Sequence, residues 1–364
     1  MNEATDWSVR MADSVLARNP IMAQRWAYEW GVTLEGIAQV WQRTGDTRYF
    51  DFIKHNIDEF VQPDGSIHTY RIDEYNLDQI NTGRQLFLLW HETGDSRYEA
   101  AIQLLRHQLE THPRTEQGGF WHKNIYPQQM WLDGIYMQGP FYVRYGVEFD
   151  EPAIFDDLTA QIILIEQHAR DPQTGLLYHA WDSSKQQRWA DPETGCSPHF
   201  WGRAIGWYMM AIPDVLDYLP ADHANRDRLI EIFNTTAEAI TRVQDPTSGL
   251  WFQVLDHPKR EGNYLEASAS SMFVYGLAKA ARQGYGQHLE TARRGLEGLI
   301  THLIDVDDQG LVNLNQVCSV AGLGGNPYRD GSYDYYISEP AVSNDFKGIG
   351  PFIMAHNELA LAAQ

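Results

Sequence analysis

The chain has 364 residues, and its 28 Lys and Arg against 49 Asp and Glu give a formal net charge of −21. Nucleic acids and anionic membrane surfaces carry charge of the same sign, so the composition argues against both as partners. A small anionic substrate is compatible with this charge, because a few basic side chains inside a cavity outweigh distant, screened charges. The 12 Trp and 19 Tyr are many for structural needs and predict contacts with sugars or other flat ligands.

No Pro-, Ser- or Gly-rich linker and no charge block divides the chain, so we expect one domain over residues 1–364. Glu3 and Asp6 stand where a signal peptide needs an apolar run, and no stretch of about 18 apolar residues occurs. We therefore expect a cytoplasmic protein, with secretion after removal of a leader as the alternative. Cys196 and Cys318 form no close-spaced ligand pair and give no disulfide framework.

Periodic apolar residues predict twelve helices along the chain. Two of the connections are nearly identical, Thr44–Tyr49 and Thr93–Tyr98, where Gly ends one helix and Asp caps the next. Six hairpins of this kind can close into a double ring, so we predict an all-α protein with an (α/α)6 barrel. An open solenoid has the same periodicity but gives no reason for aromatic residues on every long loop. The expected helices are 6–18, 27–44, 46–61, 76–92, 95–110, 127–145, 150–169, 198–219, 222–243, 263–283, 286–303 and 346–363.

The first candidate acid, Asp78, lies in the first turn of the helix expected at 76–92. Asn76 is the predicted N-cap, and Gln79 three residues later resembles the second half of a capping box. An acid in the first turn is favourable for the helix dipole alone, so a purely structural role competes with a functional one. Asp78 follows a long loop, which predicts that it lies on the same rim of the barrel as the second acid, Asp133.

Asp133 lies in the aromatic helical run expected at 127–145, where Pro127 suits a first-turn position. At helical spacing it shares the inward stripe with Met130 and Met137. A carboxylate on such a face is costly unless something uses it or bonds it. We interpret Asp133 as a candidate general acid, and a buried aspartate bonded to a backbone or Trp N–H is the alternative.

His122 and Lys123 precede this helix, and His179 follows a later turn that is rich in aromatic residues. Each can line the mouth of a site, although an isolated histidine such as His179 is more often structural. The sequence contains no HExxH motif, no paired-cysteine site and no phosphate-binding glycine loop after a strand. We therefore expect neither a metal nor a cofactor.

A well-defined helix start is predicted at 198–219, with Ser197 as N-cap and Pro198 at the first helical position. His199 and Arg203 are four residues apart and share a face of this helix. A helix N-terminus with an Arg beside it suits a carboxylate, so Arg203 is a candidate for binding an acidic sugar. The alternative is that Arg203 pairs with a structural acid and that Trp201 belongs to the core.

Taken together, these motifs resemble the unsaturated rhamnogalacturonyl hydrolases of glycoside hydrolase family 105, from about Trp26 to the C-terminus. The Trp-Leu-Asp-Gly and Trp-Gly-Arg blocks are specific, whereas the Thr-Gly-Asp turns are general among six-hairpin barrels. The resemblance rests on Asn76–Asp78, Gly119–Lys123, Gln129–Gly134, Tyr178–Asp182, Phe200–Trp207 and Ser338–Pro340.

This resemblance implies an (α/α)6 barrel that releases a Δ4,5-unsaturated uronic acid, here a galacturonyl group, from the non-reducing end of rhamnogalacturonan oligosaccharides made by lyases. The related unsaturated glucuronyl hydrolases of family 88 use the same chemistry. The resemblance further implies that Asp133 is the general acid and base and that Asp78 assists it. The sugar subsite would then be lined by His122, Lys123, His179, Trp201 and Arg203.

Two other functions stay open at this point. A sugar isomerase or epimerase of the same barrel type would work through paired histidines, for which His122, His179 and His199 are candidates. A glycan-binding protein without activity would use the aromatic mouth but needs no acid on an apolar helix face. The sequence determines neither the aglycone nor the oligomeric state.

Overall fold

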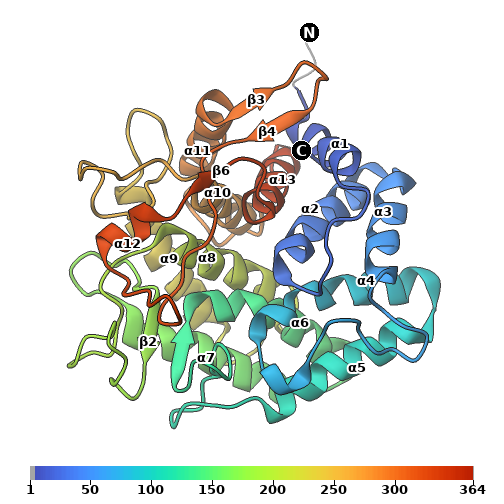
Figure 1. Cartoon of the computed structure of the whole chain (residues 1–364), viewed down its shortest axis with the longest axis horizontal. Coiled ribbons are helices and arrows are strands. Elements are labelled where there is room, and N and C mark those ends of the chain that lie inside the picture. The colour runs from blue at the N-terminus through green and yellow to red at the C-terminus, as the bar shows by residue number, and fades with distance from the viewer. Residues whose placement is uncertain (1–4, 364) are drawn as a thin grey trace.

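The computed structural model describes residues 5–363, and twelve of the thirteen helices found there form two concentric rings (Figure 1). The inner ring consists of α2 (Tyr28–Thr44), α4 (Arg84–Thr93), α6 (Leu132–Glu148), α8 (Gly202–Leu216), α10 (Ala267–Arg282) and α13 (Phe346–Leu361). The outer ring consists of α1 (Trp7–Arg18), α3 (Thr47–Asp58), α5 (Ser96–Thr111), α7 (Ala153–Ala169), α9 (Arg226–Arg242) and α11 (Leu289–His302).

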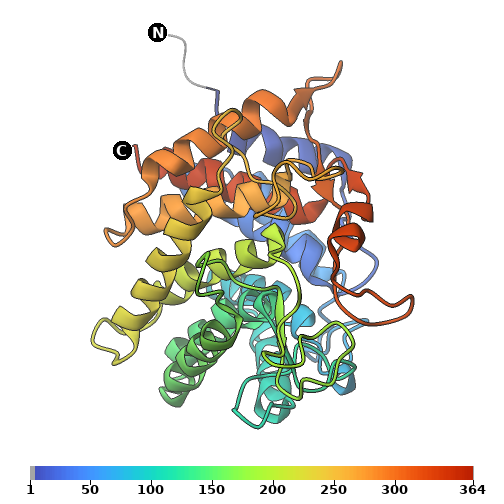
Figure 2. The ribbon, with the colours of Figure 1, turned by 90° about the vertical axis from the view of Figure 1, so that its left-hand side faces the viewer.

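Each outer helix packs mainly on one inner helix, and the last inner helix closes the ring. The outer helices α3, α5, α7, α9 and α11 pack against the inner helix that precedes them in the chain, while α1 packs against α13. Because α13 also contacts both α2 and α10, the first and last inner helices are neighbours (Figure 2). The predicted (α/α)6 barrel is confirmed.

The inner helices are buried far more completely than the outer ones. Every residue of α8 is buried, as is typical of a helix surrounded by other helices. Residues near the C-terminal ends of all six inner helices surround a single cavity of about 390 Å³. These residues are Gln42, Leu88, Arg144, Asp214, Arg282 and Glu358. The six inner helices therefore run in the same direction. The N-terminal ends of the inner helices therefore gather at the opposite end of the barrel.

The remaining elements are short and lie between the helices. Strand β1 (Gln129–Trp131) pairs antiparallel with β2 (Ala180–Asp182), β3 (Ile304–Val306) with β4 (Val312–Leu314), and β5 (Val317–Cys318) with β6 (Ala341–Val342). The short helix α12 (Tyr333–Ser338) lies between β5 and β6 in the chain and was not predicted. Within residues 5–363, no helix has both the length and the apolar character needed to cross a membrane.

The two repeated turns form as predicted. Gly45 and Gly94 end their helices with φ angles of 71° and 68°, a left-handed conformation that glycine adopts without steric cost. The carboxylates of Asp46 and Asp95 then accept hydrogen bonds from backbone N–H groups in the first turn of the next helix. These connections depend only on neighbouring residues, which is why the sequence predicts them well.

The three helix starts that the sequence tied to a named cap or proline were predicted wrongly, and in each case pairing with distant residues determines the start. The helix predicted from residue 76 begins at Arg84, after the 3₁₀ turns Leu77–Gln79 and Asn81–Gly83. Pro127 is not in a first turn, because residues 129–131 form strand β1 and α6 begins at Leu132. Likewise Ser197 is not an N-cap: its backbone N–H donates to the carbonyl of Ala180, and α8 begins five residues later. The helices predicted from residues 222 and 263 also begin four residues later, at Arg226 and Ala267.

Candidate active site

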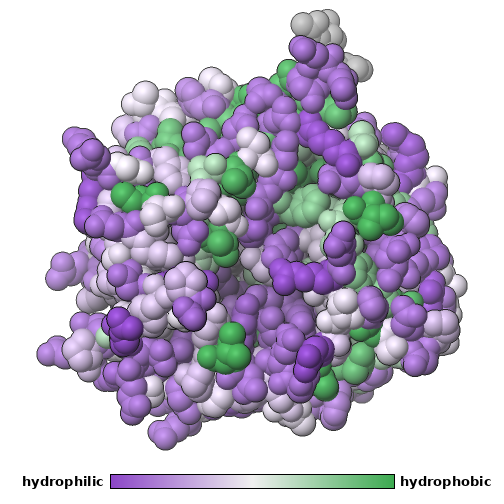
Figure 3. Space-filling view, viewed as in Figure 1, coloured by the Kyte–Doolittle hydropathy of each residue, from purple (hydrophilic) through white to green (hydrophobic). Residues whose placement is uncertain are grey.

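A cavity of about 480 Å³ opens at the barrel end where the inner helices begin. This volume is typical of a small-molecule site. The face of the molecule in Figure 3 is mostly hydrophilic and hollowed near its middle. The candidate residues that line the cavity are Asp78, His122, Lys123 and Asp133, together with Trp26, Tyr28, Tyr126, Trp131 and Arg329.

The cavity at the other end of the barrel is a weaker candidate, because its charged side chains neutralise one another. Asp214 lies 3.0 Å from Arg84 and 2.6 Å from Lys279, and Arg282 lies 2.7 Å from Glu358. Among the described residues, every charged side chain that lines this cavity has an opposite charge within 4.0 Å.

Asp133 occupies the first turn of α6, where the helix dipole favours a negative charge. Its side chain is 12% exposed, and its Oδ2 atom lies 3.3 Å from Nε2 of His179. Both of these atoms are sealed from solvent, and neither meets the geometry of a hydrogen bond with any group within residues 5–363. The exposed part of the carboxyl group therefore includes Oδ1, which is the oxygen on the cavity side.

His179 is held behind Asp133 by contacts on both sides. The pairing of β1 with β2 brings the two segments together, and the backbone N–H of Leu132 donates to the carbonyl of His179 at 3.1 Å. On the far side of the ring, Nδ1 of His179 lies 2.8 Å from the hydroxyl of Tyr336. His179 is fully buried, so it acts on the cavity only through Asp133.

Asp78 faces the same cavity but has a cationic partner. Lys123 Nζ lies 2.5 Å from one carboxylate oxygen, and His122 Nε2 lies 3.5 Å from the other. Burial alone would raise the pKa of Asp78, but the charge of Lys123 and the nearby His122 outweigh this and hold the pKa below its usual value. Asp78 is therefore ionised at neutral pH.

Local structure explains why Asp78 and these basic residues meet. Asn76 and Lys123 form a β-bridge, and the backbone N–H of Leu77 donates to the carbonyl of His122. The side chain of Asn76 accepts from the backbone N–H of Asp78, as predicted for a cap, but Gln79 bonds Glu74 and completes no capping box.

One wall of the cavity is a stack of flat rings. The ring of His122 lies 4.5 Å from that of Trp131, and the Tyr126 ring lies 4.9 Å from Trp131 on nearly parallel planes. Burial lowers the pKa of His122 to about 4 even though Asp78 is close, so this imidazole is neutral near pH 7. Stacked aromatic faces of this kind suit the apolar face of a sugar ring.

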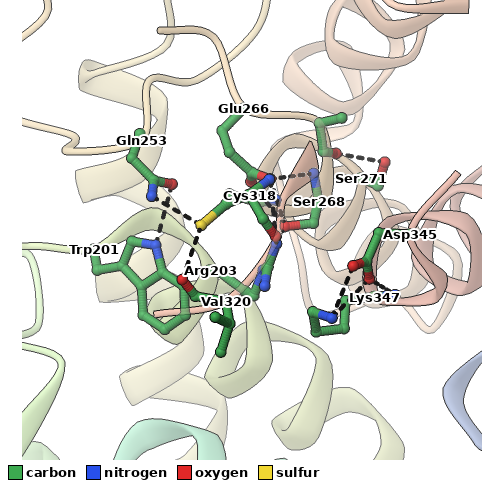
Figure 4. A network of polar contacts seen from close by, with 12 residues as sticks. Trp201, Arg203, Gln253, Glu266, Ser268, Ser271, Cys318, Val320, Asp345 and Lys347 are labelled. Carbon is green, nitrogen blue, oxygen red and sulfur yellow. Dashed lines mark hydrogen bonds and ion pairs between the residues drawn. The ribbon is translucent and has the colours of Figure 1, made fainter. Parts of the chain in front are cut away.

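Arg203 and Trp201 lie in the protein interior and not on the cavity wall. Arg203 is 1% exposed; its guanidinium donates to Ser268 Oγ at 2.7 Å and to the backbone carbonyl of Cys318, and it lies 3.5 Å from Glu266 (Figure 4). Trp201 donates from its indole N–H to Gln253 and packs its ring 4.7 Å from that of His179. The structure therefore gives Arg203 a buried acid as partner, and Trp201 supports His179 from behind.

The three histidines of the isomerase hypothesis do not converge. His199 packs against His257 and Tyr333, with ring centroids 5.5 Å and 6.2 Å away, and does not line the cavity. Across the described part of the chain, no group of three or more His, Cys, Asp or Glu side chains is arranged to hold a metal ion.

Sequence reasoning missed several residues of this site, among them Tyr126, Tyr336 and Arg329. Tyr126 belongs to the same aromatic-rich run of the sequence as Asp133, and this composition could have indicated it. Tyr336 and Arg329 come from the region around α12 and reach the site from far along the chain, so no local pattern points to them.

Comparison with known proteins agrees with this fold. The sequence model of Glycosyl Hydrolase Family 88 matches residues 3–362. A family 105 glycoside hydrolase from C. acetobutylicum superposes with a TM-score of 0.96 at 50% identity, covering 98% of this chain and 100% of that one. A possible family 105 member from Klebsiella pneumoniae gives a TM-score of 0.82 at 26% identity, covering 100% and 95%.

Two relatives with different coverage were also found. Protein Atu3128 of Agrobacterium fabrum is 41% identical over 233 residues, which is 62% of this chain and 99% of the relative. YesR of Bacillus subtilis, an unsaturated rhamnogalacturonyl hydrolase, is 29% identical over 276 residues, which is 74% of this chain and 75% of YesR. These matches confirm the resemblance that the motifs indicated and favour a glycosidase over an isomerase or a glycan-binding protein.

Proposed function

The chain belongs to Glycosyl Hydrolase Family 88, and from this premise we propose that it releases a Δ4,5-unsaturated galacturonic acid from the non-reducing end of rhamnogalacturonan oligosaccharides. The choice of uronate and aglycone is supported by the similarity to YesR, which is named for that activity. Lyases that cleave pectic chains by elimination produce such unsaturated ends.

The observation that carries the proposal is the contrast between the two carboxyl groups of the cavity. Asp78 has Lys123 at 2.5 Å, which keeps it ionised, whereas no Lys or Arg within residues 5–363 lies within 4.0 Å of Asp133. A carboxyl group without a cationic partner is suited to carry and return a proton, and a fixed carboxylate is suited to stabilise positive charge. Two carboxyl groups in different environments thus support two different roles.

In the proposed reaction, Asp133 protonates C4 of the C4=C5 enol ether, and positive charge develops at C5 and the ring oxygen. Water then adds at C5 and gives its proton to the Asp133 carboxylate, which restores the acid. The resulting hemiketal opens at the bond between C5 and the ring oxygen, and the hemiacetal left at C1 expels the aglycone as an alcohol. One carboxyl group serves both proton transfers, so the spacing rule for two-carboxylate glycosidases does not apply.

Asp78 assists in this scheme as a fixed carboxylate. It accepts a hydrogen bond from a sugar hydroxyl and stabilises the cationic centre at C5 by charge. Lys123 and His122 keep it ionised and in position, and the ring stack of Tyr126, Trp131 and His122 supports one face of the sugar.

In the proposed mechanism, the contact between Tyr336 and His179 selects the oxygen of Asp133 that holds the proton. Burial raises the pKa of Tyr336 well above its usual value, so its hydroxyl keeps its hydrogen, and we propose that it donates this hydrogen to Nδ1 of His179. In the proposed arrangement this donation leaves the ring hydrogen of His179 on Nε2, facing Oδ2 of Asp133. The acid proton of Asp133 consequently belongs on Oδ1, the oxygen on the cavity side.

Isotope labelling tests the reaction. Turnover in deuterated water should place deuterium at C4 of the ring-opened product, and turnover in ¹⁸O-water should label its C5 carbonyl before washout. Loss of the conjugated ultraviolet absorbance should keep pace with aglycone release. Release of an intact unsaturated uronate with the new oxygen at C1 would refute the hydration mechanism while leaving the fold assignment unaffected.

A further inference from the structure

Arg329 brings a positive charge to the catalytic cavity from a loop that no family motif covers. The loop runs over residues 319–331 between β5 and α12, and Val320, Ala321 and Arg329 line the same cavity as Asp133. In Figure 1 the orange-red segment between these elements descends toward the green segment around β2. The position of Arg329 at the cavity is therefore set by the C-terminal part of the chain.

The loop holds the Arg329 side chain in a defined place. Leu323 is fully buried in a small apolar cluster with Trp131 and Trp189, which fixes the loop against the cavity wall. The guanidinium of Arg329 donates to the carbonyls of Gly324 and Leu323 at 3.0 Å and 3.2 Å, and to the hydroxyl of Tyr126 at 2.8 Å. These bonds use Nε and Nη2 and leave the two hydrogens of Nη1 without an acceptor among residues 5–363.

All the partners of Arg329 are neutral. Within the described residues, no carboxylate lies within 4.0 Å of its guanidinium, although the chain carries 49 acidic residues. The other Lys and Arg residues at or near the site have acids: Lys123 has Asp78 at 2.5 Å, Arg203 has Glu266 at 3.5 Å, and Arg25, which also lines the cavity, has Glu29 at 3.8 Å. A half-buried cation that has lost part of its water and has no counter-ion is costly, and an anionic ligand removes that cost.

We infer that Arg329 binds an anionic oxygen group of the substrate through Nη1. The inference rests on the proposed function, and it assigns to Arg329 the task that the sequence suggested for Arg203. The anionic group has two sources, the carboxylate of the unsaturated uronate or a carboxylate or sulfate on the aglycone. In both cases a guanidinium held by three neutral oxygens is pre-organised to accept the charge.

The test compares Arg329→Gln with Arg188→Gln on a small set of unsaturated disaccharides. Arg188 is the matched control, because it is exposed and stacks 4.2 Å over the Tyr328 ring but does not line the cavity. The set contains the free uronate with a neutral aglycone, its methyl ester, and the ester with an acidic aglycone. Arg329→Lys tests whether charge without the guanidinium fork is sufficient.

Arg329→Gln should lower kcat/KM about 10- to 100-fold on substrates that carry the recognised charge and change it less than threefold on those that lack it. If kcat/KM falls on the free uronate but not on its ester, the recognised group is the uronate carboxylate. If kcat/KM falls only on the substrate with the acidic aglycone, the recognised group lies on the aglycone. Arg188→Gln should leave every kcat/KM within twofold, and Arg329→Lys should recover part of the loss.

Equal losses on charged and uncharged substrates would overturn the inference, because they would mean that Arg329 only shapes the loop. An effect of Arg188→Gln as large as that of Arg329→Gln would also overturn it, by showing that only the overall charge matters. Failure of the proposed function is distinguishable from both outcomes, since the wild-type protein would then turn over none of the disaccharides.

Discussion

Tyr336 is the partner of His179 on the side away from the cavity, with its hydroxyl 2.8 Å from Nδ1 across a separation of 157 residues. Because His179 in turn faces Asp133 at 3.3 Å, a residue that does not line the cavity holds the histidine that stands behind the candidate acid. A hydrogen-bonded partner on the second ring nitrogen is the usual way in which proteins select one tautomer of histidine.

Replacing Tyr336 by Phe should lower kcat about 5- to 10-fold with KM little changed, because about 1 kcal/mol of orienting hydrogen bond is lost. Tyr335→Phe is the matched control, since the Tyr335 hydroxyl accepts a bond from Gly322 N–H and makes no contact with His179. Steady-state kinetics give kcat and KM of the two variants for comparison with the wild type. A similar fall in kcat for both would mean that α12 matters only as a structural support.

Asp133→Asn should reduce kcat by about 10²- to 10⁴-fold while substrate still binds, because the side-chain volume is kept and the transferable proton is removed. Binding is measured by isothermal titration with an intact disaccharide, which the inactive variant does not consume. A variant that keeps more than a tenth of the wild-type kcat would exclude Asp133 as the general acid.

Lys123→Met should move the acidic limb of the kcat/KM profile to higher pH. Lys123 is the main charge that keeps the pKa of Asp78 low against the effect of burial, so its loss lets that pKa rise. Ionised Asp78 is then lost earlier as the pH falls. Profiles between pH 4 and 8 are compared with those of Lys185→Met, which removes an exposed lysine; acidic limbs that coincide with the wild type would contradict the assigned role of Lys123.

The protein should lose stability as the pH falls from about 6.5 to 4, with each buried histidine contributing at most about 1.4 kcal/mol per pH unit. Burial lowers the pKa values of His112 and His122 to about 4, so in this range the unfolded chain binds protons that the folded chain excludes. Urea unfolding of the wild type and His112→Gln at several pH values measures the effect. An unchanged slope in the variant would rule out a contribution from His112.

Arg203→Met should destabilise the fold by about 3–5 kcal/mol, because it leaves the fully buried Glu266 without its cation. Glu266 keeps the N–H groups of Ala269 and Cys318 as hydrogen-bond donors. The double variant with Glu266→Gln should recover much of the loss. If the single variant unfolds within about 1 kcal/mol of the wild type, the pair is not a determinant of stability.

The sequence predicted the helical hairpins because their signals are local. Apolar periodicity, Gly45 and Gly94 as helix ends, and Asp46 and Asp95 as caps involve only neighbouring residues, and tertiary packing agrees with them. The starts of α4, α6 and α8 were missed because β1–β2 pairing and bridges to distant backbone compete with helix formation there. Pro127 and Ser197 are good helix-start residues in sequences where no such partner exists.

The site was predictable in its acids but not in its partners. The sequence pointed to Asp133 because it is an acid on an apolar helix face, and to Asp78 because it is an acid next to a predicted cap after a long loop. Both line the cavity. The environment of each acid depends on contacts between segments far apart, such as Leu132 with His179. Arg203 was wrongly predicted to line the site. Its place near a helix start suggested that it binds a substrate carboxylate, but its guanidinium pairs with Glu266 at the start of another helix.

Closure of the inner ring by α13 has a consequence for biosynthesis. The seam that α13 fills between α2 and α10 joins residues near the two ends of the chain, so it cannot form until the last helix has left the ribosome. Until then the apolar flanks of α2 and α10 lack their partner. A ribosome that stalls before residue 346 therefore presents an open barrel with an exposed apolar seam, which makes the nascent chain a client for chaperones.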